Sequence, residues 1–381
     1  MKKLLTTIIL CMVIIVIVSF RSTAVQSSYY TLPELRERYG SGDTSRWPEA
    51  FLDSSVAAGF KEIGVLPEMK FPEDNPYSDA KKELGKMLFF DPRLSGSGQI
   101  ACASCHDSEL GWGDGRRLSY GHDRQLGKRN SMTLLNVGYA DSLFWDGRAA
   151  SLEEQVDFPL TDTLEMHSDH KIAVGNIRRI AGYRIEFFKA FGDTMVSFDR
   201  IRKALATFER TIVSGTSRFD LFVQGDTSRL SDREVLGLHL FRTKARCINC
   251  HNTPLFSDNK FHNTGLTYYG RKYEDLGRYE HTGKKEDVGR FRTVTLREIA
   301  RTAPYMHNGI FPNLRGIINL YNAGMPRPAR KPHQQNDSLF PETSPLLKKL
   351  DLTDKEKIAL QAFLLTLTSR SRREDPPLLP Q

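Results

Sequence analysis

The sequence predicts a mainly α-helical protein of two domains with long loops. Three observations support this fold class: apolar residues recur at helical spacing, strand-like alternation is sparse, and a Cys-x-x-Cys-His motif occurs once in each half of the chain. The chain has 381 residues, of which 39% are hydrophobic and 26% charged. This composition is typical of a soluble globular protein, and the length suits about two domains.

Before residue 215 we expect two helices. The first covers residues 78–90 and ends at Asp91-Pro92, because proline does not continue a helix. A Gly/Ser-rich turn at 95–98 then leads to the first motif. Between residues 198 and 213 the apolar side chains form one helical stripe, which predicts a helix with a buried face. The stripe consists of Ile201, Leu205, Phe208 and Ile212.

The polar, turn-rich segment 215–229 is the expected boundary between two domains, 25–214 and 215–381. Ser231 and Glu234 then form a capping box for a helix that delivers the second motif.

A second capping box, Thr353 with Glu356, predicts a helix near the C-terminus. The Pro-rich stretch 325–345 is expected to be an excursion near the second motif.

The N-terminal residues 1–24 have the pattern of a secretory signal peptide. Two lysines precede an apolar run from Leu4 to Phe20, and small residues follow it. The alternative is a retained membrane anchor, because the run is long for a signal. Both interpretations place the body of the protein outside the cytoplasm, and we expect it in the periplasm.

The net charge of +8 suits an acidic partner protein, although charges scattered over a solvated surface would give the same value. The basic residues are neither clustered in a tail nor interleaved with aromatic residues. Nucleic-acid binding is therefore not expected.

The two Cys-x-x-Cys-His motifs contain four of the five cysteines. Disulfides, zinc or a redox pair would use the cysteines without requiring the histidine. Covalent haem c requires all three residues, since two thiols bond the vinyl groups and the histidine ligates the iron. We therefore predict two cytochrome c-like haem domains with His106 and His251 as iron ligands. The motifs are Cys102-Ala103-Ser104-Cys105-His106 and Cys247-Ile248-Asn249-Cys250-His251.

Four further sequence blocks accompany the motifs. They are Leu88-Phe89-Phe90-Asp91-Pro92-Arg93-Leu94-Ser95, Gly127-Lys128-Arg129-Asn130-Ser131, Phe144-Trp145-Asp146-Gly147-Arg148 and Thr302-Ala303-Pro304-Tyr305-Met306-His307-Asn308-Gly309. With them, the chain resembles the bacterial di-haem cytochrome c peroxidases and the MauG-type enzymes grouped with them. The resemblance implies that the N-terminal haem reduces hydrogen peroxide. The C-terminal haem would pass in electrons from a small cytochrome c or cupredoxin.

Splitting the O–O bond of peroxide requires an open iron position and a nearby group that moves a proton. A carboxylate in the haem pocket can do this. By the resemblance, Glu165 matches the catalytic acid and Gln155 its hydrogen-bonding neighbour. Trp145 would lie between the haems, where it can relay an electron and also serve as a core residue.

The resemblance also implies a calcium ion between the domains. Asn130, Thr302 and Pro304 match its ligands, which supply side-chain and backbone oxygens suited to a hard cation.

For the sixth iron ligands, one candidate matches the peroxidases and the other matches the MauG-type enzymes. His122 matches the histidine that closes the peroxidatic haem in resting peroxidases, although an ordinary loop histidine is equally consistent with the sequence. Tyr321 stands where those peroxidases have an axial methionine, as it does in MauG-type enzymes. Met325, four residues further on, is the competing ligand for the C-terminal haem.

Two other functions remain compatible with the sequence. One is a purely electron-transferring di-haem cytochrome c with both irons closed. The other is a MauG-type, peroxide-dependent oxidase of a partner protein. The sequence also leaves a homodimer open.

Covalent attachment gives the first testable prediction. After expression with a haem-attachment system, the denatured protein should keep its pigment, and its mass should exceed that of the polypeptide by two haems. A mass equal to the bare polypeptide would contradict this assignment.

Overall fold

The computed structural model describes residues 30–370 and 373–381, so the expected signal segment 1–24 lies outside them. The described chain is mainly helical, which confirms the fold class. Its strands are one antiparallel pair of two-residue strands, β1 (Phe261–His262) and β2 (Phe291–Arg292). The helices are α2 (Leu32–Tyr39), α3 (Ser54–Ala57), α4 (Asp79–Phe90), α5 (Leu152–Gln155), α6 (Asp157–Thr161), α7 (His170–Arg178), α8 (Ala181–Phe191), α9 (Phe198–Arg210), α10 (Arg218–Val223), α11 (Asp232–Arg242), α12 (Tyr279–Thr282), α13 (Leu314–Asn322) and α14 (Asp354–Leu365).

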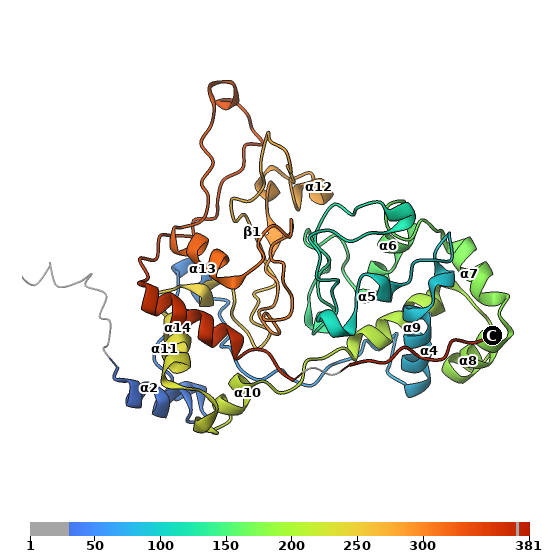
Figure 1. Ribbon diagram of the computed structural model, residues 1–381, viewed down its shortest axis with the longest axis horizontal. Helices are drawn as coiled ribbons and strands as arrows, with labels where there is room; N and C mark the ends of the chain where they lie inside the picture. Colours follow the sequence, from blue (N-terminus) through green and yellow to red (C-terminus); the bar gives the residue numbers. More distant parts are fainter. Residues whose placement is uncertain (1–29, 371–372) are drawn as a thin grey trace, which may run out of the picture.

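The elements form two lobes (Figure 1). Helices α4 to α9 build the first lobe, and α2, α3 and α10 to α14 build the second. Each lobe has its own cluster of buried apolar side chains. Residues around 325–345 form an arm that projects from the second lobe. Within residues 30–370 and 373–381, no helix is both long enough and apolar enough to cross a bilayer.

The two lobes repeat one helix crossing, which the sequence analysis did not detect. In the first lobe α4 crosses α9 at Gly85, where an added Cβ would lie 1.9 Å from the Ala204 carbonyl oxygen. In the second lobe α11 crosses α14 at Gly237, where it would lie 2.0 Å from the Ala359 oxygen. Only glycine permits so close an approach of the two backbones.

Matching aromatic pairs lie one helical turn beyond each glycine. The ring centroids of Phe89 and Phe208 are 5.3 Å apart, and those of Phe241 and Phe363 are also 5.3 Å apart. All four rings are almost fully buried, and edge contacts of this kind stabilise the core. The two lobes are therefore built on the same helix-crossing scaffold.

The predicted helix starts are confirmed. The Ser78 side chain accepts a hydrogen bond from the Lys81 N–H at the start of α4. In α11 the Glu234 carboxylate accepts hydrogen bonds from both the N–H and the hydroxyl of Ser231. Thr353 and Glu356 form the corresponding box at α14.

The two ends of the described chain do not belong to the lobes that the expected division at residue 214 assigns to them. Leu35 and Ile63, in the segment expected to belong to the first domain, pack into the core of the second lobe. The Glu62 carboxylate also forms an ion pair there with the buried Arg242. Conversely, residues 373–381 return to the first lobe, where the Gln381 carbonyl accepts a hydrogen bond from Gly182. A division by chain order misses this exchange, because it depends on contacts between residues far apart in sequence.

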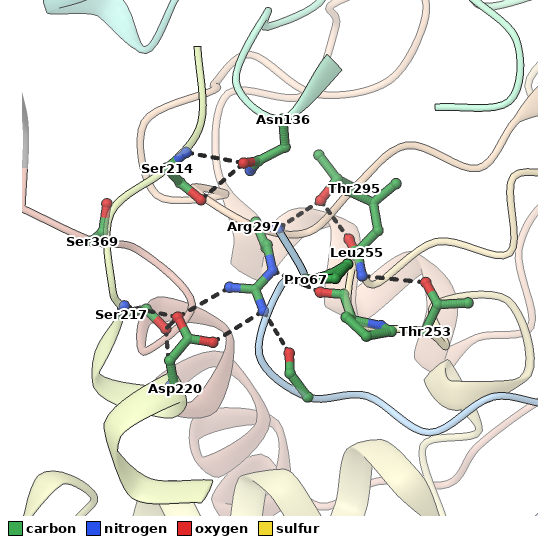
Figure 2. Close-up of polar contacts among 12 residues, drawn as sticks. Pro67, Asn136, Ser214, Ser217, Asp220, Thr253, Leu255, Thr295, Arg297 and Ser369 are labelled. Atoms are coloured by element: carbon green, nitrogen blue, oxygen red, sulfur yellow. Dashed lines mark hydrogen bonds and ion pairs between the residues drawn. The ribbon is translucent and has the colours of Figure 1, made fainter. Parts of the chain in front are cut away.

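The segment 215–229, expected to be a linker, contains helix α10, and its Asp220 is almost fully buried. The Asp220 carboxylate accepts hydrogen bonds from both Nη atoms of Arg297, at 3.1 and 3.0 Å (Figure 2). Arg297 also donates to the carbonyls of Gly64 (2.6 Å) and Pro254 (2.7 Å). One buried ion pair thus connects four distant segments near the second motif.

The close helix crossing in the second lobe predicts that a methyl group added at Gly237 destabilises the protein. We expect Gly237→Ala to lower the free energy of unfolding by about 1–3 kcal/mol or more, because the Ala359 backbone cannot move aside easily. Gly175→Ala is the matched control, since Gly175 lies inside α7 with no atom within 4 Å of the added Cβ. It should raise stability by about 0.5–1 kcal/mol. Equal effects of the two substitutions in denaturant unfolding would contradict this account.

Candidate haem sites

Both Cys-x-x-Cys-His motifs fold into the same short 3-10 turn. The turns cover Cys102–Ser104 and Cys247–Asn249. In each, the N–H of the motif histidine donates to the carbonyl of the first cysteine, at 3.1 Å for His106 and 2.9 Å for His251. The turn therefore brings both cysteines and the histidine together on a short stretch of backbone. None of the four thiols forms a disulfide.

A backbone carbonyl orients each motif histidine. Nδ1 of His106 lies 3.0 Å from the Trp112 oxygen, and Nδ1 of His251 lies 2.9 Å from the Phe256 oxygen. A carbonyl can only accept, so Nδ1 carries the hydrogen and Nε2 keeps its lone pair for a metal. Burial lowers the pKa of both imidazoles, which favours the neutral form that ligates iron.

A cavity of about 560 Å³ adjoins the first motif. Its volume lies within the range of about 300–1,000 Å³ that is typical of cofactor pockets. The walls combine apolar side chains with many polar and charged ones. The residues expected to act at this site line it together, and these are Cys102, Cys105, His106, Asn130, Trp145, Gln155 and Glu165. The residues fit a haem attached to the first motif.

Two carboxyl groups in this cavity have raised pKa values. Burial raises the pKa of Glu165, and Asp162 adds to the effect while Arg148 opposes it. Burial raises the pKa of Glu209, on α9, to about 8. Sequence reasoning missed Glu209, although it follows Phe208 in the buried stripe of α9. Gln155, the last residue of α5, lines the same cavity.

Trp145 lies where the two lobes meet. Its Nε1 donates to the Asn130 carbonyl at 2.9 Å, and its own carbonyl accepts from the N–H of Arg292 in the second lobe at 2.7 Å. Arg129, next to Asn130, forms an ion pair with Asp146 of its own lobe (2.5 Å) and one with Asp275 of the second lobe (2.7 Å). Polar contacts between the lobes therefore surround this tryptophan.

Tyr321 is the expected iron ligand for the haem at the second motif. It lies in the last turn of α13. Burial raises the pKa of its hydroxyl, and the charges of Cys250 and Cys247 add to the effect. Met325 is also buried, with 6% of its surface exposed, just after the end of α13.

His122 lies beside the first cavity but is not among the residues that line it. Its N–H donates to the Glu165 carbonyl at 2.8 Å. Its ring contacts His167, with centroids 4.4 Å apart, and its Nε2 lies 3.3 Å from the Asp123 carboxylate.

The residues expected to bind calcium lie near the contact between the lobes. The Asn130 N–H donates to the carbonyl of His307, three residues after Pro304, at 2.8 Å. The Asn130 amide also donates to the Arg116 carbonyl at 2.7 Å, and its Oδ1 accepts no hydrogen bond from a described residue. That oxygen is available to a cation. Thr302 and Pro304 belong to the same loop and are half-buried.

Two haem-attachment motifs, placed on two lobes with a common scaffold, define a di-haem cytochrome-like protein. A family model described as di-haem cytochrome c peroxidase matches residues 79–228. The cytochrome-c peroxidase IdrP1 of Pseudomonas sp. (strain SCT) is 36% identical over 348 residues, which cover 84% of this chain and 89% of that protein. The methylamine utilization protein MauG of Methylophilus methylotrophus is 36% identical over 326 residues, covering 84% and 91%. The chain belongs to the di-haem cytochrome c peroxidase family.

Solved structures agree with this assignment. A MauG-like protein associated with microbial copper homeostasis has a TM-score of 0.72 and 35% identity, covering 80% of this chain and 94% of that one. The diheme peroxidase BthA of Burkholderia thailandensis has a TM-score of 0.65 and 25% identity, covering 83% and 96%.

Proposed function

We propose that this protein reduces hydrogen peroxide to water in the cavity of the first lobe, with electrons that enter through the second lobe. The observation that carries the proposal is the buried carboxyl of Glu165 in the cavity that also contains His106. A cytochrome that only transfers electrons needs no proton-transferring acid in the haem pocket. The peroxidase names of several relatives support the same activity.

Haem c, bound covalently through both motifs, would supply the electrons and the coordination position that peroxide needs. His106 and His251 would hold the two irons from the proximal side through Nε2. Their Nδ1–H bonds to backbone carbonyls fix the ring orientation and increase the basicity of Nε2.

Glu165 would move the proton in the cavity. Its carboxylate would accept a proton from one oxygen of peroxide and donate it to the other, which would assist cleavage of the O–O bond. With two electrons from the donor and two further protons, both oxygens would leave as water. Burial raises the pKa of this carboxyl, which makes it a better proton acceptor than an exposed glutamate. Gln155 would orient the peroxide by hydrogen bonding. Trp145, at the contact between the lobes, would relay electrons between them.

Calcium would bind at the contact between the lobes through Asn130, Thr302 and Pro304, with side-chain and backbone oxygens as ligands. The donor would be a small cytochrome c or cupredoxin, and the net charge of +8 favours an acidic partner surface. We also propose export to the periplasm, where c-type cytochromes of this family would meet such donors.

A second candidate is MauG-type oxidation of a partner protein with peroxide. A tyrosine rather than a methionine at position 321 favours this branch, and the charges of Cys250 and Cys247 raise its pKa. A tyrosinate ligand would hold the second haem at low potential, whereas a methionine would raise it.

We expect Glu165→Gln to lower peroxide turnover about 10²- to 10⁴-fold, because glutamine cannot transfer the proton. Haem content and spectra should stay unchanged. Glu154→Gln is the matched control, because Glu154 lies on α5 outside the cavity lining. Steady-state kinetics with a reduced donor would measure the effect, and unchanged turnover in Glu165→Gln would show that another group is the acid.

The two candidate ligands of the second haem can be separated by substitution. We expect Tyr321→Phe to change the spectrum of the C-terminal haem and raise its potential, since it removes an anionic ligand. Met325→Leu should leave both unchanged. A redox titration in which only Met325→Leu perturbs this haem would make Met325 the ligand.

Calcium removal should lower activity and alter the haem spectra, because it would disorder the contact between the lobes near Trp145. Exhaustive chelation followed by calcium addition tests this. Full activity and unchanged spectra after chelation would exclude a functional calcium site.

A further inference from the structure

Arg292 is the residue whose surroundings remain unexplained by the proposed function. It lies on β2 of the second lobe, yet it lines the cavity of the first lobe beside Trp145. Only 8% of its surface is exposed. A side chain of the second lobe therefore forms part of the wall around the first haem site.

The contacts of Arg292 leave most of its charge unmatched. Its Nε donates to the Phe144 carbonyl at 3.2 Å, and Nη2 lies 3.9 Å from the Met132 sulfur, which is a weak acceptor. No acidic residue in the described part of the chain forms an ion pair with it. Burial lowers its pKa to about 10, an effect that the charge of Asp141 opposes without forming an ion pair, and the guanidinium stays charged at neutral pH.

The other fully buried arginines show what a guanidinium in this protein normally binds. Each described arginine that is buried to the same degree has a carboxylate partner. These pairs are Arg210 with Glu153, Arg242 with Glu62, and Arg297 with Asp220. Burying a cation without an anion costs several kcal/mol. The exception at Arg292 therefore indicates that its anion comes from whatever fills the cavity.

Peroxide is neutral at physiological pH and cannot supply this anion. Haem c carries two propionate carboxylates, and a guanidinium fork binds a carboxylate with two parallel hydrogen bonds. We propose that Arg292 binds a propionate of the haem in the first lobe, so that the second lobe supplies the cation that completes this cofactor site. The inference rests on the haem assignment of the proposed function.

This contact has a consequence for electron transfer. The Arg292 N–H also binds the carbonyl of Trp145, so a single residue joins the second lobe, the tryptophan and the first haem. A positive charge beside the haem favours the reduced iron. Docking of the lobes would thus set the potential of the first haem.

The test compares Arg292→Gln with Arg292→Lys in the full-length holoprotein, by redox titration without peroxide. Glutamine keeps N–H donors for the Phe144 carbonyl but removes the charge, whereas lysine keeps the charge. At a fixed potential near the wild-type midpoint, Arg292→Gln should lower the ratio of reduced to oxidised first haem about tenfold, and Arg292→Lys should stay within about threefold of wild type. Resonance Raman bands of the propionates should shift in Arg292→Gln.

Arg278→Gln is the matched control. Arg278 also belongs to the second lobe and donates to the Asp146 carbonyl at 3.0 Å, but it is not among the residues that line the cavity. Its substitution should leave the ratio within about twofold of wild type. An unchanged ratio in Arg292→Gln, or an equal shift in Arg278→Gln, would overturn the proposal.

The failure of this inference is distinguishable from failure of the proposed function. The titration needs no peroxide, so an inactive wild-type protein with an Arg292-dependent potential would support the propionate contact alone. A protein whose mass shows no haem at the first motif would overturn both.

Discussion

The buried ion pair between Arg297 and Asp220 is the constraint on which the arrangement of the chain depends. It connects three segments to Arg297: the chain at Gly64, where it leaves the second lobe for the first, helix α10 with Asp220, and the loop after the second motif at Pro254. Removing one partner would leave an uncompensated charge in the interior, at a cost of about 3–5 kcal/mol. The Pro254 contact also supports the loop whose Phe256 carbonyl orients His251, so the pair links the crossing between the lobes to the second haem site.

The two lobes position their haem motifs with the same structural features. A glycine lets two helices approach closely, an aromatic pair fills the space one turn further on, and a carbonyl orients the motif histidine. The lobes then differ in what faces the iron. The first has a cavity with Glu165 and Gln155, and the second has Tyr321, whose pKa is raised by burial and by the charges of its cysteines. The proposed division of peroxide chemistry and electron entry between the lobes is based on this difference.

Local patterns made the helices and the haem motifs predictable. The caps at Ser78, Ser231 and Thr353 and the stripe of α9 depend on residues within one or two turns. The packing of residues 30–63 in the second lobe was not predictable, nor were the crossing at Gly237 and the helix within 215–229, because these depend on contacts between distant segments. The roles of Glu165, Gln155 and Trp145 came from the family resemblance, and the structure brings these side chains into one cavity. The role of Arg292 was not predictable from the sequence, because only the structure shows that it is buried without a carboxylate partner.

The central claim is that the first lobe reduces peroxide with electrons delivered through the second. The most direct measurement is the stoichiometry of donor oxidation, using the full-length holoprotein with its second haem reduced and a small cytochrome c as the donor. Because peroxide takes two electrons and the donor gives one, the account predicts two donor molecules oxidised for each peroxide consumed. If the protein accepts electrons from the donor but does not consume peroxide, it is an electron carrier and the account is wrong.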